Sequence, residues 1–132
     1  MPRLKVFIRS PQQRHKLLRF TPVCRKKTIT RHAAVIIEAK YLELLRRGYE
    51  VTVGRTGDKE IDFVCDKRGE KLYVQVCYLL ASDETVNREF GAYDSIRDNF
   101  PKYVVSLDEF DMSRNGIKHR NIRDFLLAEE WN

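Results

Sequence analysis

Short runs in which apolar and polar residues alternate dominate the middle of the chain. Residues 50–55, 60–65 and 71–79 follow this pattern, which predicts three β-strands. The turn-forming segment Lys67-Arg68-Gly69-Glu70 separates the second run from the third, so these two strands are expected to form a β-hairpin. Further strands are expected at residues 4–8, 102–107 and 117–121.

Three helices are expected from apolar residues at helical spacing and from residues typical of helix ends. The first covers residues 30–47, where Thr30 can cap the start and Gly48 can end the helix. The second opens at residues 82–84 and is expected to continue toward Pro101. A short closing helix is expected at residues 122–128.

This order of elements predicts an α/β fold. From the first helix onward the chain reads helix, three strands, helix, strand, which is an αβββαβ order. Three successive strands form a meander, and a helix that crosses over to the next strand gives a mixed sheet flanked by helices. The 132 residues suffice for one domain with a single core.

One face of the first helix carries an acid among apolar residues. Val35, Leu42 and Leu45 are spaced so that they share a face with Glu38. If this face packs on the sheet, an unpaired Glu38 carboxylate would be costly. A metal ion beside the sheet would compensate its charge. The alternatives are that the Glu38 side chain extends to solvent or pairs with an arginine.

Positive charge is concentrated at the start of the chain. Residues 1–37 contain ten Lys or Arg and no acid, whereas residues 38–132 contain fifteen Lys or Arg and nineteen Asp or Glu. This change suggests a basic extension, residues 1–29, followed by an α/β domain, residues 30–132. The extension is interpreted either as an arm that binds phosphates or as a solvated segment without a partner.

The composition favours a cytoplasmic protein. No run approaches the roughly 18 apolar residues of a membrane span, and the basic N-terminus lacks the apolar core of a secretory signal. Three cysteines do not form an even disulfide set, and they and the three histidines are too scattered to favour a zinc site. These residues are Cys24, Cys65, Cys77, His15, His32 and His119.

The predicted hairpin carries the most informative polar residues. Asp62 lies on one strand and Gln75, thirteen residues later, on the next, so their side chains can lie side by side. Two neighbouring oxygen donors are what a hard cation such as Mg²⁺ binds. Glu60, two residues before Asp62, is expected on the same face and is an alternative ligand to Gln75.

This hairpin resembles the active site of the PD-(D/E)xK nuclease superfamily, and the αβββαβ order resembles its restriction-endonuclease-like core. The resemblance implies that Asp62 holds a metal ion, that Gln75 stands where a second acid is usual, and that Cys77 stands where a lysine activates water. A glutamate on the first helix often completes such sites, which makes Glu38 a further candidate ligand. The implied catalytic residues are Asp62, Gln75 and Cys77.

Longer strings resemble the C-terminal domain of a prokaryotic family of AAA-type ATPases. They include residues 41–51, 60–64 and 73–78 and continue to residue 127. The family places a P-loop ATPase before a nuclease-like domain, and this chain looks like that second part alone. It has no GxxxxGK[ST] segment, so it is not expected to bind ATP.

The chain departs from this family on the first helix. The family glutamate stands four residues before the tyrosine of the Tyr-Leu-Glu-Leu string, and Ile37 occupies that position here. Glu38 follows one residue later, about 100° around the helix.

Two functions follow from these departures. Replacing an acid by Gln75 weakens Mg²⁺ binding, and Cys77 cannot replace a lysine that positions water. The sequence therefore favours a degenerate nuclease-like domain that serves as a module for interaction with nucleic acid or protein. The alternative is a weak Mg²⁺-dependent DNA nuclease that uses Asp62 and Gln75.

Overall fold

A computed structural model describes residues 5–7, 31–56 and 59–132. Among these residues a six-stranded mixed sheet has three helices packed against it. The strands are β1 (Lys5–Phe7), β2 (Glu50–Thr56), β3 (Lys59–Lys67), β4 (Glu70–Val76), β5 (Lys102–Ser106) and β6 (Lys118–Asn121). The helices are α2 (Arg31–Arg46), α3 (Asp83–Gly91) and α4 (Ile122–Leu127).

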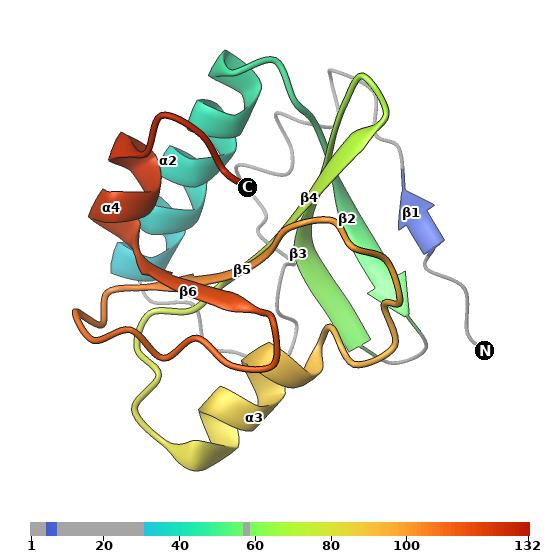
Figure 1. Ribbon diagram of the computed structural model, residues 1–132. Coiled ribbons are helices and arrows are strands. Elements are labelled where there is room, and N and C mark those ends of the chain that lie inside the picture. The colour runs from blue at the N-terminus through green and yellow to red at the C-terminus, as the bar shows by residue number, and fades with distance from the viewer. Residues whose placement is uncertain (1–4, 8–30, 57–58) are drawn as a thin grey trace.

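The strands follow one another across the sheet in chain order. Strands β1 to β4 are antiparallel neighbours, and β4–β5 and β5–β6 pair in parallel. Helices α2 and α4 cover one face of the sheet and α3 covers the other (Figure 1). The predicted α/β fold, with its αβββαβ order and mixed sheet flanked by helices, is confirmed.

A tight turn closes the predicted hairpin. Arg68 and Gly69 both have positive φ, 56° and 84°, which is the backbone of the two-residue turns that suit the twist of antiparallel strands. Lys67 pairs with Glu70 directly beside this turn. The hairpin expected from the sequence is therefore present.

Strand β1 lies within the segment expected to be an extension. Its residues pair with β2 from Lys5↔Arg55 to Phe7↔Val53. Residues 5–7 of the predicted extension, residues 1–29, thus form an edge strand of the sheet. The rest of the proposed phosphate-binding arm lies outside the described residues.

Helix α2 packs on the sheet with a different face from the one predicted. Ile37, Tyr41 and Leu44 are buried against the sheet, whereas Val35 and Leu42 are 62% and 50% exposed. Both sets have helical spacing, and only packing on the sheet distinguishes them. The interpretation of the Val35–Leu42 stripe as the core face was wrong, although Leu45 is partly buried as expected.

Helix α3 is shorter than the spacing of its apolar residues suggests. Ser82 caps its start, as predicted, by accepting a hydrogen bond from the Thr85 N–H, but the helix ends at Gly91 rather than near Pro101. Tighter turns follow, such as the bond from the Ile96 N–H to the Tyr93 carbonyl. These turns keep the apolar residues directed toward the core without a continuous helix.

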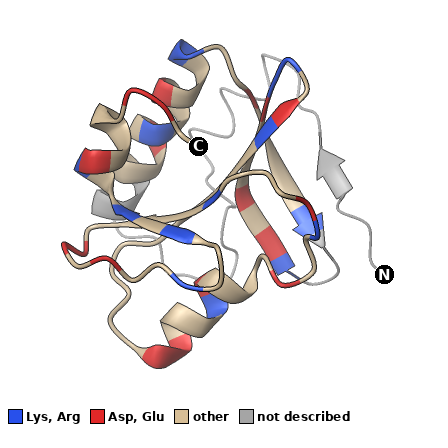
Figure 2. Ribbon diagram, in the orientation of Figure 1, with Lys and Arg blue, Asp and Glu red and all other residues tan. Residues whose placement is uncertain are grey.

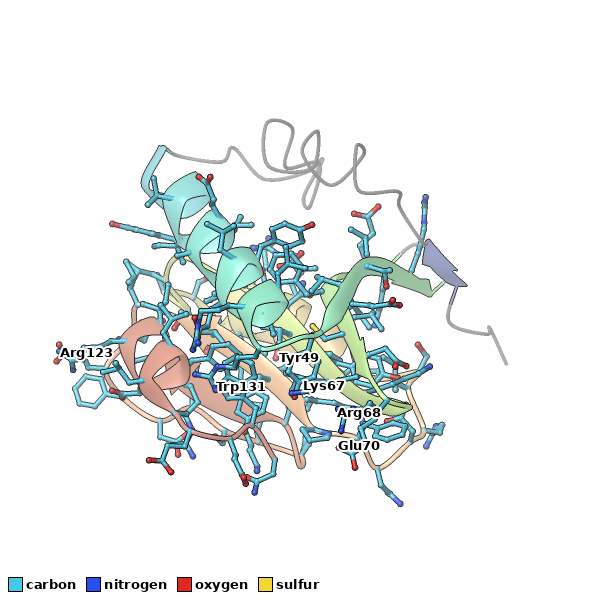
Figure 3. All side chains as sticks on the ribbon, turned by 90° about the horizontal axis from the view of Figure 1, so that it is seen from above. Tyr49, Lys67, Arg68, Glu70, Arg123 and Trp131 are labelled. Atoms are coloured by element: carbon cyan, nitrogen blue, oxygen red, sulfur yellow. The ribbon has the colours of Figure 1, made fainter. Side chains whose placement is uncertain are left out.

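The chain end returns to cover the α2–α4 side of the core. Trp131 stacks on Phe125 with ring centroids 4.6 Å apart, and its indole N–H donates to the Phe125 carbonyl. The Arg47 guanidinium lies 3.9 Å from the centroid of the Trp131 ring. The Tyr49 ring also contacts Trp131, and the Lys67 ammonium lies 5.4 Å from the centroid of the Tyr49 ring (Figure 3).

Candidate functional site

Strands β3 and β4 stop pairing at the position of Asp62 and Gln75. Their register continues from Lys67↔Glu70 to Phe63↔Val74, and the next opposing positions are those of Asp62 and Gln75. Both strands extend beyond this point, but side-chain hydrogen bonds replace the regular ladder. The predicted placement of these two residues on neighbouring antiparallel strands is confirmed.

Asp62 and Gln75 each bond to the backbone of the opposite strand. The Val76 N–H donates to Asp62 Oδ2 at 2.7 Å, and the Asp62 N–H donates to Gln75 Oε1 at 3.0 Å. Both side chains are buried, with exposures of 1% and 5%. These bonds satisfy polar groups that the interrupted ladder would otherwise leave buried without partners.

Gln75 also connects the hairpin to α3. Its amide Nε2 donates to Glu89 Oε2 at 3.0 Å, and the Glu89 side chain is fully buried. Arg88, which is half exposed, lies 3.4 Å from the other Glu89 oxygen. A glutamate at position 75 would place a second carboxylate beside Glu89, whereas the glutamine amide supplies the donor that Glu89 accepts.

A buried lysine approaches the same region from α2. Lys40 is completely buried, and its ammonium donates to the Val105 carbonyl at 3.4 Å. Burial lowers the pKa of Lys40 from 10.5 to about 7, while Coulombic interactions with Asp62 and Cys77 act in the opposite direction. The site thus contains a lysine supplied by α2, although Cys77 stands at the position where the resemblance implies a lysine.

Sequence reasoning missed Lys40 and Glu89 because it assigned the wrong helix face and treated charged residues as solvated. A signal for both was present. Lys40 falls within the buried stripe of Ile37, Tyr41 and Leu44, and Glu89 lies beside the buried Phe90. Charged residues at core-facing positions are rarely buried without a partner, so they mark a polar network.

The positions of Glu38 and Glu60 do not favour the metal-ligand roles predicted for them. Glu38 is exposed on the face of α2 that also carries the exposed Leu42, so the argument that it needs a compensating partner no longer holds. Glu60 is half-buried and pairs across β2–β3 with Arg55. Their roles as metal ligands stay predictions without support from this geometry.

A bulge in β3 weakens the argument that placed Glu60 on the face of Asp62. Thr52 pairs with Val64 and Gly54 with Ile61, so β3 has one more residue here than β2. Ile61 and Val64, three residues apart, both join the core on the α3 side. Regular alternation therefore does not extend through Asp62.

Cys77 is buried just beyond the end of β4. Its thiol Sγ donates to the Leu79 carbonyl at 3.2 Å, and it is 7% exposed. It lies two residues after Gln75 and near Lys40. Nothing in this arrangement gives the thiol access to a substrate.

Two of the oxygens at Asp62 and Gln75 are engaged within the protein. Asp62 Oδ2 and Gln75 Oε1 each accept a backbone N–H, and both residues are buried. Within residues 5–7, 31–56 and 59–132, no group of three or more His, Cys, Asp or Glu side chains could hold a metal ion. The predicted Mg²⁺ role of Asp62 and Gln75 thus gains no support from this geometry.

A second polar cluster joins the ends of β5 and β6. Buried Ser106 donates to Asp108 Oδ2 at 2.7 Å and lies 2.7 Å from His119 Nε2, while His119 Nδ1 accepts the Met112 N–H. Because Nδ1 is an acceptor, Nε2 carries the proton and donates to Ser106. Burial lowers the pKa of His119. The histidine therefore cannot take a proton from Ser106, and the cluster is structural rather than a nucleophilic triad.

Comparison with known proteins shows a similarity to a bacterial protein. The chain is 36% identical over 88 residues to a protein from Haemophilus influenzae described as an uncharacterized protein. The match covers 66% of this chain and 21% of that relative, so the chain spans about a fifth of the length of the protein it matches. No model of a known protein family matches the chain, and no solved structure does.

Within the described part of the chain, no helix has the length and apolar character needed to cross a membrane.

Proposed function

We propose that this chain is a catalytically degenerate nuclease-like domain that acts as a module for interaction with nucleic acid or protein. The observation that carries the proposal is the use of Gln75. Its carbonyl oxygen accepts the Asp62 N–H and its amide donates to Glu89, so the position of the second catalytic acid has become a buried link between β3, β4 and α3.

The chemistry of this link favours a structural role. A metal-dependent nuclease needs carboxylate oxygens directed toward a solvent-filled site and a polarised water. Here Asp62, Gln75 and Glu89 are buried, and their contacts are with the protein's own backbone and side chains. A domain that keeps the fold but closes the site retains its outer surfaces for binding.

Plasmid nicking tests this proposal. The purified chain is incubated with supercoiled DNA, with and without Mg²⁺ or Mn²⁺, beside the variant Asp62→Ala. We expect the same background of nicked plasmid in every reaction. Cleavage that requires the metal and disappears in Asp62→Ala would reject the degenerate assignment.

A weak Mg²⁺-dependent nuclease is the second candidate, and Lys40 favours it. Its ammonium lies close enough to Asp62 and Cys77 for Coulombic interactions with them to affect its pKa, so α2 supplies a cation near Cys77, where the resemblance expects a lysine. A pKa of about 7 is also suitable for proton transfer at neutral pH.

Lys40→Met distinguishes the two candidates in the same nicking experiment. If the domain is a nuclease, metal-dependent cleavage should fall by roughly 10²–10⁴-fold in Lys40→Met. Lys71→Met, which changes a half-buried lysine of β4, is the matched control. A Lys40→Met variant that folds and nicks as well as the unmodified chain would remove the support that Lys40 gives to this candidate.

A further inference from the structure

A cavity of about 750 Å³ lies beside the C-terminal end of α3, apart from the Asp62–Gln75 network. Its walls come from the end of α3, the segment 93–100 that follows it, and the turn at residues 114–117. This volume is within the usual range of small-ligand sites, roughly 300–1,000 Å³. Arg97, Arg114, Asn87, Asn99, Asn115 and Phe100 are among the lining residues.

The acids that line this cavity already have cationic partners. Asp98 lies 2.9 Å from the Lys102 ammonium and accepts the Tyr73 hydroxyl at 2.6 Å. Asp94 lies 3.4 Å from Lys59. The positive charges of Arg97 and Arg114, which also line the cavity, are therefore not cancelled by these carboxylates.

Arg97 and Arg114 give the cavity two guanidinium groups. Within the described ranges, neither Arg97 nor Arg114 forms an ion pair, and both are exposed. The Arg114 guanidinium lies 5.2 Å from the centroid of the Phe90 ring, which holds it against the cavity wall. Two guanidinium groups at one cavity favour a ligand with a phosphate.

The remaining lining residues suit a nucleobase. Phe100 and Ile96 are half-buried and give the cavity an apolar wall on which a flat ring can stack. Asn87, Asn99 and Asn115 add amides that both donate and accept hydrogen bonds at the edge of a ring.

We infer that this cavity binds one nucleotide of a single-stranded nucleic acid, with its phosphate at Arg97 and Arg114 and its base against Phe100. The inference rests on the proposed function, and it assigns a site to the nucleic-acid branch of that function. A strand presents one phosphate charge per nucleotide, which two arginines can balance. A free nucleoside triphosphate would place several negative charges in a domain whose residues 38–132 already have four more acids than bases.

Fluorescence anisotropy with a labelled single-stranded DNA of ten nucleotides tests the site. The double variant Arg97→Ala/Arg114→Ala should bind roughly 10- to 100-fold more weakly than the unmodified chain, because charge-assisted hydrogen bonds to phosphate are lost. The slope of log affinity against log salt should also fall by about 0.7, because one phosphate contact is lost. Arg123→Ala is the matched control, because Arg123 is an exposed arginine of α4 on another part of the molecule (Figure 3).

Cross-linking reports the position of the base independently of the basic N-terminal residues. A strand with 5-iodouracil is irradiated with the full chain, and the tryptic peptides are analysed by mass spectrometry. We expect the cross-link in peptide 98–102, which contains Phe100. Trypsin no longer cleaves after position 97 in the double variant, so there the corresponding peptide is 89–102, and it should carry no cross-link. Melting temperatures of all variants, expected to stay within a few degrees of the unmodified chain, show that they are folded.

The outcomes separate this inference from the proposed function. If the chain binds the strand but the double variant binds equally well, and cross-links map to residues 1–37, the cavity assignment is wrong while a nucleic-acid role stands. If no nucleic acid binds, both the cavity assignment and the nucleic-acid branch fall, and a protein partner remains. Equal competition by adenosine monophosphate would instead identify a free nucleotide and overturn the strand assignment.

Discussion

Gln75 shows how one residue can change the chemistry of a site while preserving the fold around it. Its amide donates to Glu89 on α3 and its carbonyl accepts from Asp62 on β3. An isosteric carboxylate could accept from Asp62 but could not donate to Glu89. The glutamine is thus compatible with a buried Glu89, and a glutamate is not unless a proton or cation lies between them.

Changing Gln75→Glu should therefore destabilise the domain. With two buried carboxylates side by side, we expect a loss of roughly 2–5 kcal/mol at pH 8, measured by urea unfolding. The repulsion raises the pKa of one carboxyl group in the folded state, so stability is lost as pH rises and the loss should be smaller near pH 5. Millimolar Mn²⁺ should recover part of it.

The exchanged double variant is the control for this prediction. In Gln75→Glu/Glu89→Gln the donor and acceptor change places, so most of the lost stability should return. If Gln75→Glu alone is as stable as the unmodified chain at pH 8, the bond between Gln75 and Glu89 has no energetic role.

Lys40 should make the free energy of unfolding depend on pH in the alkaline range. Its pKa is about 7 in the folded protein and about 10.5 when exposed, so between these values the unfolded chain binds more protons. Stability should then rise between pH 7 and about 9.5, by up to about 1.4 kcal/mol per pH unit.

Urea unfolding at several pH values measures this slope. Lys40→Met should abolish most of it, whereas Lys71→Met should leave it intact. A slope that is the same in all three proteins would show that Lys40 keeps its ordinary pKa in the folded state.

At the scale of the element, α2 has two apolar stripes with opposite environments. Leu44 is completely buried, while Leu42, two residues earlier, is 50% exposed. The sheet has room for only one stripe, and the side that carries Tyr41 also brings Lys40 to the polar network.

Alanine substitutions should report this asymmetry directly. Leu44→Ala should cost roughly 2–5 kcal/mol of unfolding free energy because it leaves a cavity in the core. Leu42→Ala, the same change on the outer stripe, should cost less than about 1 kcal/mol. Equal losses in chemical denaturation would mean that both stripes are covered in solution.

Helix α3 serves two parts of the molecule at once. Its inner side directs Glu89 to Gln75, and its end forms a wall of the cavity that contains Arg97. The early end of the helix at Gly91 frees the following residues for the turns that line this cavity.

At the scale of the whole molecule, acidic and basic residues are interspersed over the described helices and strands (Figure 2). The excess of positive charge comes from residues 1–37. Any general attraction for nucleic acid is therefore expected from the N-terminal residues, and any selective contact from a defined site such as the cavity beside α3.

The chain is expected not to bind ATP. It has no glycine-rich loop with the Lys-Ser/Thr pair that surrounds the phosphates in P-loop proteins. Isothermal titration of the full chain with Mg²⁺-ATP should give no saturable heat up to about 100 μM, a range in which P-loop proteins bind. Saturation at micromolar ATP would contradict both this expectation and the single-phosphate balance of the cavity.

Local sequence determined most of the elements of this protein. Alternation, turn residues and caps depend on interactions within a few positions, so the hairpin at Arg68-Gly69, the cap at Ser82 and the order of strands followed from the chain alone. The opposition of Asp62 and Gln75 also followed, because the turn fixes the register of the two strands.

Tertiary packing decided what those residues do. Which stripe of α2 faces the sheet depends on the shape of a surface built from strands distant in sequence, and this choice buried Lys40 and exposed Glu38. The bond between Gln75 and Glu89 likewise requires α3 to lie against the hairpin. Strand alternation could place an acid and an amide side by side, but only the packed helices determined that their polar atoms would bond to the protein itself.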